Sequence, residues 1–292
     1  MKESDKKEQG KNTVSEIEIF SVPFASEEID ENITITTTTT TNIPTQPYQE
    51  QLINQAFTNH LQGNIQEAEK YYQHFIHQGF KDHRLFSNYG LLLKDINKLE
   101  EAEILTRKAI ELKSDFANAH YNLGTILIDL RKLEEAEIYI RKAIALQPDF
   151  SYAHLNLGTA LIGLGKLEEA EIFTRKAIVL KPDFTEAHSN LGNILKDLGK
   201  LEEAEISYRK AIALQPDYGE ARYNLAFLEL LQGHYQSGLK NYEFRFKTKK
   251  AVIPHCTTRI KRLDNEKLQL GEKLLVITEQ GLGDTIQFMR YI

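Results

Sequence analysis

The chain of 292 residues has little of what builds a covalently stabilised or membrane-embedded protein. Its single cysteine, Cys256, excludes an internal disulfide and a zinc site built from several cysteines. No apolar run approaches the ~20 residues that span a bilayer. The charged first twelve residues also lack the apolar segment of a secretory signal. We therefore expect a protein without a membrane span in the reducing environment of the cytoplasm.

The net charge of −6 is unevenly distributed along the chain. Residues 1–47 hold four lysines against nine acidic residues, whereas residues 245–273 hold nine basic against three acidic residues. The segment between them is therefore net acidic, although a nucleic-acid-binding domain needs a basic face. We expect no nucleic-acid partner.

Residues 1–47 have the composition of a disordered, acidic and threonine-rich tail. They combine scattered charge with three prolines and an unbroken run of threonines from Thr36 to Thr41. A solvated tether is the favoured interpretation, and a modification site or a short edge strand remains open.

A period of 34 residues dominates the chain from residue 49 onward, and such self-similarity fixes an architecture more firmly than any local pattern. The recurring residues include Gly90, Gly124, Gly158 and Gly192, and also Pro148, Pro182 and Pro216. The period divides the chain into six units, 49–82, 83–116, 117–150, 151–184, 185–218 and 219–252. Repeat positions below are counted from the first residue of each unit.

The pattern resembles the tetratricopeptide repeat, with small residues at positions 8, 20 and 27 and proline at position 32. Positions 4, 7, 8 and 11 form one apolar stripe at helical spacing, and positions 20, 24 and 27 form a second, so each unit predicts two amphipathic helices. A glycine at position 15 in four units predicts the turn between them. The resemblance implies an all-α fold, a right-handed α-solenoid of tandem helix-turn-helix units.

Asparagine recurs at position 6, on the side of the first helix opposite the apolar stripe, where we expect an exposed concave groove. Asparagine is a poor helix former, so its repetition calls for a reason. A ladder of amides pairing with the backbone of an extended peptide is one, and such a ladder is a feature of the O-linked N-acetylglucosamine transferase repeats that these units resemble. Recent duplication of a unit whose asparagine bonds a neighbouring helix or water is the alternative. The ladder residues are Asn88, Asn122, Asn156, Asn190 and Asn224.

Selectivity for a peptide would come from side chains beside the ladder. The candidates are Tyr121, Thr125, Asp129, Thr159, Asn193 and Asp197. A receptor for a terminal carboxylate needs Lys or Arg beside the asparagines, and Arg84 is the one such residue in a full-pattern unit. We regard that variant as less favoured.

His120, His154 and His188 also recur every 34 residues, at position 4. Helices of successive units pack ~8–10 Å apart, whereas three ligands of one zinc each lie ~2 Å from it. We expect packed histidines, no metal and no cofactor. Glu-before-Arg pairs four residues apart in the second helices, such as Glu137 with Arg141, are expected on solvated faces.

After a basic linker, 253–272, the pattern changes. Residues 273–292 predict a strand, a glycine-containing loop and a helix start, which resembles the opening of a two-domain glycosyltransferase of the heptosyltransferase type. That resemblance implies Asp284 as a candidate general base, and a nucleotide-sugar ligand only if a full domain follows. A glycine turn on any α/β domain is the alternative. One strand and one helix form no sheet core, so we expect no catalysis from this chain alone.

Two functions follow from the sequence. The first is a protein-interaction scaffold that holds an extended peptide or partner segment in the groove of the repeats. The second is the substrate-recruiting, amino-terminal part of a bacterial glycosyltransferase whose catalytic domain is not within these residues.

Overall fold

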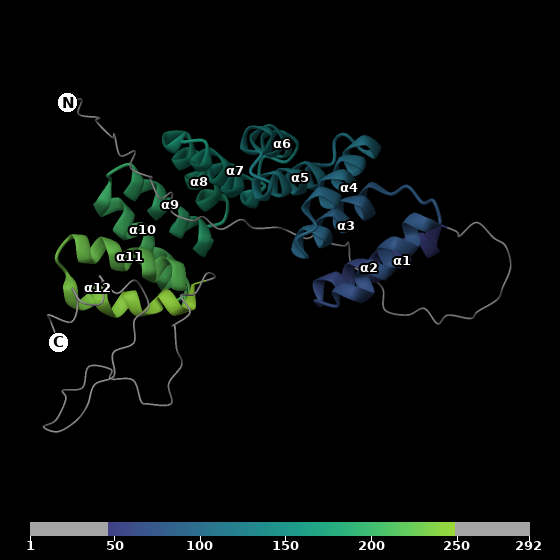
Figure 1. Cartoon of the computed structure of the whole chain (residues 1–292). Helices are drawn as coiled ribbons and strands as arrows, with labels where there is room; N and C mark the ends of the chain where they lie inside the picture. The colour runs from purple at the N-terminus through teal and green to yellow at the C-terminus, as the bar shows by residue number, and fades with distance from the viewer. Residues whose placement is uncertain (1–45, 249–292) are drawn as a thin grey trace, which may run out of the picture. The chain divides into compact units, whose positions relative to one another are not determined.

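The computed structural model describes residues 46–248. Within this range the chain forms twelve α-helices and one 3-10 helix, and no strand (Figure 1). The helices are α1 (Gln46–Leu61), α2 (Ile65–His77), α3 (His83–Asp95), α4 (Leu99–Leu112), α5 (Ala117–Asp129), α6 (Leu133–Leu146), α7 (Ser151–Gly163), α8 (Leu167–Leu180), α9 (Thr185–Asp197), α10 (Leu201–Leu214), α11 (Gly219–Leu231), α12 (Tyr235–Tyr242) and η1 (Glu243–Lys247). The predicted all-α fold of tandem helix pairs is confirmed for these residues. The predicted linker 253–272, the stub 273–292 and all but the end of the tail 1–47 lie outside them.

The odd-numbered helix of each pair is called helix A below, and the even-numbered one helix B. Helices pack most extensively within a pair, and helix B also packs on the next helix A, as α4 does on α5. From α3 onward each helix A begins at the first residue of a predicted unit. The chain also divides into two compact units that are larger than the repeats, residues 1–207 and residues 208–292. They are described separately, and 'first unit' and 'second unit' below refer to these two.

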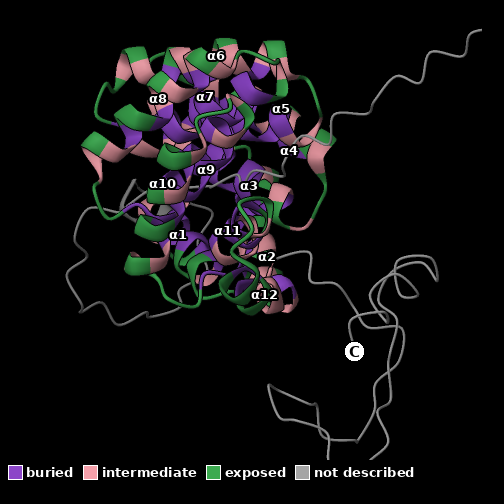
Figure 2. Cartoon of the chain, turned by 90° about the vertical axis from the view of Figure 1, so that its left-hand side faces the viewer, coloured by how far each residue is buried: buried purple, intermediate pink, exposed green. Residues whose placement is uncertain are grey.

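Helices A and B of the first unit differ in how much of their circumference is buried. Every residue from 119 to 128 in α5 is buried, and so is every residue from 153 to 162 in α7. In α6, by contrast, burial is confined to one stripe of Ala136, Ile140 and Ala143. Figure 2 shows the same contrast, with α7 mostly purple and α6 green and pink. Helix A is therefore the inner layer and helix B the outer one.

The turn between helix A and helix B has one conformation in every pair. Position 15 lies in the left-handed region, with φ of 74° at Gly165 and 75° at Gly199. The two non-glycine residues at this position, Asn97 and Arg131, adopt it as well, with φ of 62° and 61°. The amide of the following residue closes the turn, as where Lys132 N–H donates to the Leu127 carbonyl at 2.9 Å.

We expect Arg131→Gly to raise the free energy of unfolding by about 0.5–1 kcal/mol. A left-handed backbone is strained for a residue with a Cβ, and this gain exceeds the extra chain entropy of glycine. Urea unfolding followed by circular dichroism measures the change. Gly165→Ala, at the same position of the next pair, should have the opposite sign, and a stabilising Gly165→Ala would contradict the explanation.

Helices A and B come into close contact at position 8. A methyl group on Gly124 would overlap Cγ1 of Ile140, at position 24 of the same unit, and would lie 3.4 Å from the Ala136 carbonyl oxygen. Gly90 and Gly158 meet Thr106 and Thr174 in the same way. The helix pair therefore needs glycine at this point for steric reasons and not for backbone conformation.

Gly124→Ala should lower the free energy of unfolding by roughly 1–2 kcal/mol, because overpacking outweighs the ~1 kcal/mol advantage of alanine in a helix. In an Ile140→Ala background the overlap disappears, so the same change should be neutral or stabilising. Chemical denaturation of the four variants of this cycle measures the coupling. Equal effects in both backgrounds would show that the contact does not limit packing.

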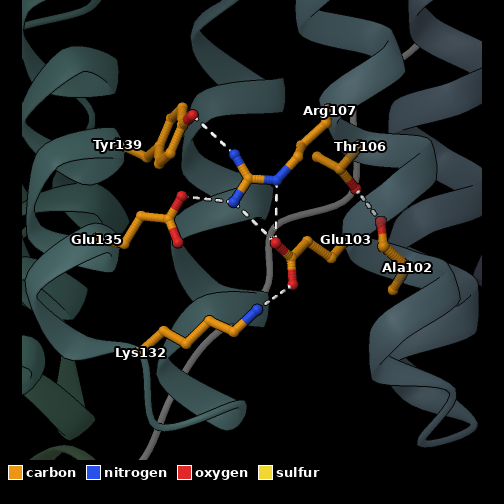
Figure 3. Close-up of polar contacts among 7 residues, drawn as sticks. All are labelled: Ala102, Glu103, Thr106, Arg107, Lys132, Glu135 and Tyr139. Carbon is orange, nitrogen blue, oxygen red and sulfur yellow. Dashed lines mark hydrogen bonds and ion pairs between the residues drawn. The ribbon is translucent and has the colours of Figure 1, made fainter.

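Ion pairs join consecutive helices B. Arg107 on α4 contacts Glu103 in its own helix and both Glu135 and Tyr139 on α6, while Lys132 reaches back to Glu103 at 2.7 Å (Figure 3). The same arrangement recurs at the next two junctions. Its members there are Glu137, Arg141, Lys166 and Glu169, then Glu171, Arg175, Lys200 and Glu203.

The Glu-before-Arg pairs lie at the surface, as expected, but their glutamates are largely covered. Only 14% of the Glu103 side chain is accessible, because the next helix B covers it. Burial alone would raise the pKa of Glu103, but hydrogen bonds from Lys132 and Arg107 outweigh it and hold that pKa below its ordinary value. The pKa values of Glu137 and Glu171 are lowered for the same reasons.

This lowering makes stability depend on pH. A carboxylate whose pKa is depressed in the folded state contributes stability above its unfolded pKa of about 4.3, and loses it as the pH falls through the folded value. We expect the urea midpoint to hold between pH 7 and pH 5 and to fall below that. Glu137→Gln should flatten this fall while lowering stability at pH 7. An acid transition that is unchanged in Glu137→Gln would exclude this carboxylate as a contributor.

The described part of the second unit buries a charged group beside its apolar core. Glu229 stands at position 11, where the four preceding repeats have leucine, and only 1% of it is accessible. Its carboxylate accepts hydrogen bonds from Arg209 at 3.1 Å and Asn241 at 2.9 Å. A buried carboxylate needs such partners, so this unit departs from the pattern of the others in a compensated way.

Candidate peptide-binding surface on the first helices

The asparagines of position 6 lie on successive helices A, but the expectation that they are exposed was wrong. In the first unit their accessible fractions are 2%, 2%, 0% and 3% at Asn88, Asn122, Asn156 and Asn190. The prediction treated helix A as packed on one side only, whereas each helix A also contacts the helices A before and after it. Asn224, in the second unit, is half-buried.

The amides reach sideways to position 5 of the preceding helix A. Asn122 Nδ2 donates to Ser87 Oγ at 3.1 Å, and Asn156 Nδ2 donates to the Tyr121 hydroxyl at 2.9 Å. The equivalent neighbour of Asn190 is Leu155, which has no acceptor, and Asn190 Nδ2 is buried without a hydrogen-bond partner among the described residues. The amide oxygens of Asn88 and Asn122 are likewise buried without a hydrogen-bond partner among the described residues.

The predicted selectivity residues fall into two groups. Four are buried: Tyr121, Thr125, Thr159 and Asn193. The threonine hydroxyls bond within their own helices, Thr125 to the Asn122 carbonyl at 2.8 Å and Thr159 to the Leu155 carbonyl at 3.3 Å. The two aspartates, Asp129 and Asp197, each keep 28% of the side chain accessible.

The aspartates stand at position 13, where helix A ends, and face position 12 of the preceding unit. Asp129 pairs with Lys94 at 3.2 Å, as Asp95 pairs with His60 at 3.0 Å. The preceding position 12 for Asp197 is Ile162, and Asp197 lies 3.6 Å from its own neighbour, Lys196.

The histidines of position 4 hold the loop between units. Nε2 of His120, His154 and His188 lies 2.8, 2.9 and 3.0 Å from the carbonyl oxygen six residues earlier. Burial lowers the pKa of His154, and its Nε2–H donates to the Pro148 carbonyl. No group of three or more His, Cys, Asp and Glu within residues 46–248 is placed to hold a metal ion.

Arg84 is already occupied by acidic side chains. Its guanidinium lies 2.6 Å from Glu50 and 2.8 Å from Asp82, and hydrogen bonds to these carboxylates raise its pKa. A guanidinium held by two carboxylates is poorly placed to receive a third from a peptide terminus. This geometry favours the peptide-backbone interpretation over a carboxylate receptor.

Sequence models define the class of these helix pairs. Residues 117–150 and 185–218 match one tetratricopeptide-repeat model, residues 139–172 match a second, and residues 83–116 match a third. Residues 83–172 and 185–218 therefore contain tetratricopeptide repeats. No curated protein sequence matches the chain.

Solved structures share the fold. PilF of Pseudomonas aeruginosa aligns with a TM-score of 0.61 and 15% identity over 68% of this chain and 90% of its own. A chain of the APC/C hetero-tetramer Cut9–Hcn1 aligns with a TM-score of 0.62 and 14% identity over 68% and 40%. A thermophilic TPR protein of Thermus thermophilus gives 0.50 and 23% over 56% and 90%. At these identities the likeness establishes the fold alone.

The comparisons give no support to the glycosyltransferase interpretation of residues 273–292. That segment, with Asp284, lies outside the described residues. Among residues 46–248, no helix is both long and apolar enough to cross a membrane.

Proposed function

We propose that the chain is a protein-interaction module that holds an extended peptide segment of a partner along the asparagines of its helices A. The observation that carries the proposal is the set of unpaired amide atoms at the oxygens of Asn88 and Asn122 and the nitrogen of Asn190. A buried polar group without a partner costs about 1–3 kcal/mol. A peptide backbone would remove that cost, because each of its residues offers one donor and one acceptor.

The row suits an extended chain. Successive helices pack ~8–10 Å apart and an extended chain rises ~3.3 Å per residue, so one amide meets about every third peptide residue. Because the asparagines are nearly covered, binding requires the side chains over them to shift, which favours slow association. The partly accessible carboxylates Asp129 and Asp197 favour a peptide with basic side chains.

The binding test compares Asn190 with Asn156. We expect Asn190→Ala to leave the free energy of unfolding unchanged or raise it by up to about 1 kcal/mol, because it removes an unpaired buried amide and adds a better helix former. Asn156→Ala removes the hydrogen bond to Tyr121 and should lower it by about 1–2 kcal/mol. Asn190→Ala should weaken peptide binding by about 5- to 150-fold, the equivalent of one unsatisfied backbone group, whereas Asn156→Ala should weaken it less, because that amide nitrogen already bonds Tyr121.

The probe is the tightest binder selected from a displayed library of random 12-residue peptides. Calorimetry measures its affinity for the wild type and for both variants, and an N-methylated copy of the peptide tests backbone recognition. Asn59→Ala, on α1 and away from position 6, is the matched control and should leave affinity unchanged. Loss of stability in both variants with unchanged affinity would make these asparagines purely structural and would overturn the proposal.

A further inference from the structure

Four consecutive helices B of the first unit, from α4 to α10, each expose one isoleucine on the outer face. Ile104, Ile138, Ile172 and Ile206 occupy position 22, and their accessible fractions are 66%, 66%, 65% and 68%. Isoleucine is among the residues most often buried, and a single exposed one means little. Four at the same place on consecutive helices B line up as one row, and apolar residues gathered on a surface in this way mark interaction sites.

Charged rows run on both sides of this isoleucine row. In α6, Glu134 precedes Ile138 by four residues and Lys142 follows it by four, which places all three on one helix face. All three are exposed, and neither charge forms an ion pair with another described residue. The same trio recurs in the neighbouring helices B as Glu100, Ile104 and Lys108 in α4, and as Glu168, Ile172 and Lys176 in α8.

The apolar row continues toward the start of the stack. Beside Ile104, a cleft of about 290 Å³ opens between α2, α3 and α4. Ile76, Tyr89 and Leu93 line it, so its walls are mainly apolar. The outer face therefore has an acidic row, an apolar row and a basic row, all parallel to the direction in which the helix pairs stack.

We propose that this outer face binds a second copy of the chain. A two-fold axis parallel to the rows lays isoleucine on isoleucine and brings the acidic row of each copy over the basic row of the other. Because Glu134 and Lys142 are equally far from Ile138 along the helix, both charge matches form at once. A two-fold axis that lies in the plane of the interface but perpendicular to the rows would set acid on acid and base on base. The charges therefore also select the orientation of the two copies.

The axis also fixes which residues meet. It preserves the order of the helix pairs, so α6 of one copy lies antiparallel to α6 of the other, with Glu134 facing Lys142 of the second copy. Because helix pairs of a solenoid turn relative to one another, the contact is limited to a few helices B around α6 and α8. Such an interface is small, and we expect a weak dimer that forms with rising concentration.

The charge swap gives a direct test. Sedimentation equilibrium over a range of concentrations measures the dimer dissociation constant of the full chain. Glu134→Lys alone and Lys142→Glu alone should each raise it at least about tenfold, because like charges then face each other in two places. The double variant Glu134→Lys with Lys142→Glu should restore it toward the wild-type value, because every contact is again between opposite charges.

A second pair of variants tests the apolar row. Ile138→Ser with Ile172→Ser should abolish the dimer in the measured range, whereas Leu61→Ser, at another exposed apolar residue away from the rows, should leave it intact. Circular dichroism checks that each variant remains helical. A monomer at every concentration, or a dimer that is indifferent to both the charge swap and the isoleucine change, would overturn the proposal.

Discussion

The contact between the glycine of helix A and the side chain at position 24 of helix B is the constraint on which the rest of the stack depends. At Gly124 there is no room for one methyl group beside Ile140. This close approach leaves the flanks of helix A free to pack against the helices A on either side. The near-complete burial of α5 and α7, and with it the burial of the asparagines, follows from that arrangement.

Different residues join successive pairs in the two layers. In the outer layer the junction is ionic, with Arg107 held between Glu103 and Glu135. In the inner layer it is made of neutral hydrogen bonds, from amides to position 5 and from histidines to the preceding loop. Salt and acid weaken the ionic layer first, because exposed ion pairs are screened whereas buried hydrogen bonds are not.

The helices were predictable from the sequence, because the 34-residue period repeats both apolar stripes and the turn. The left-handed turn at Arg131 was harder to predict, because arginine does not favour a left-handed backbone. The alignment of Arg131 with Gly165 in the repeat was the only indication of it. The burial of Asn156 could not be derived from a helical wheel, because a wheel shows one helix only. Tyr121, which contacts Asn156, belongs to the preceding helix A, α5. A spacing of 35 residues between a hydroxyl and an asparagine was the available signal.

The exposed isoleucines were equally visible in the sequence, as the residue that closes each L-E-E-A-E-I segment. One apolar residue among charges on the outer side of an amphipathic helix does not disturb the helical pattern, so it passes unnoticed in a single unit. Only its accessible fraction, near two-thirds in four consecutive helices B, distinguishes a surface feature from an edge of the core.

The three junctions between α4, α6, α8 and α10 repeat the same ion pairs in the same direction, and this has a consequence for how the array can change in length. Removing residues 151–184 as a block would place Glu203 against Arg141 and Lys200 against Glu137, the same pairs that the native junctions form. It would also give the unpaired Asn190 amide the Tyr121 hydroxyl that Asn156 now uses. A gene that gains or loses one such block would therefore encode a protein whose junctions are all of a kind already present.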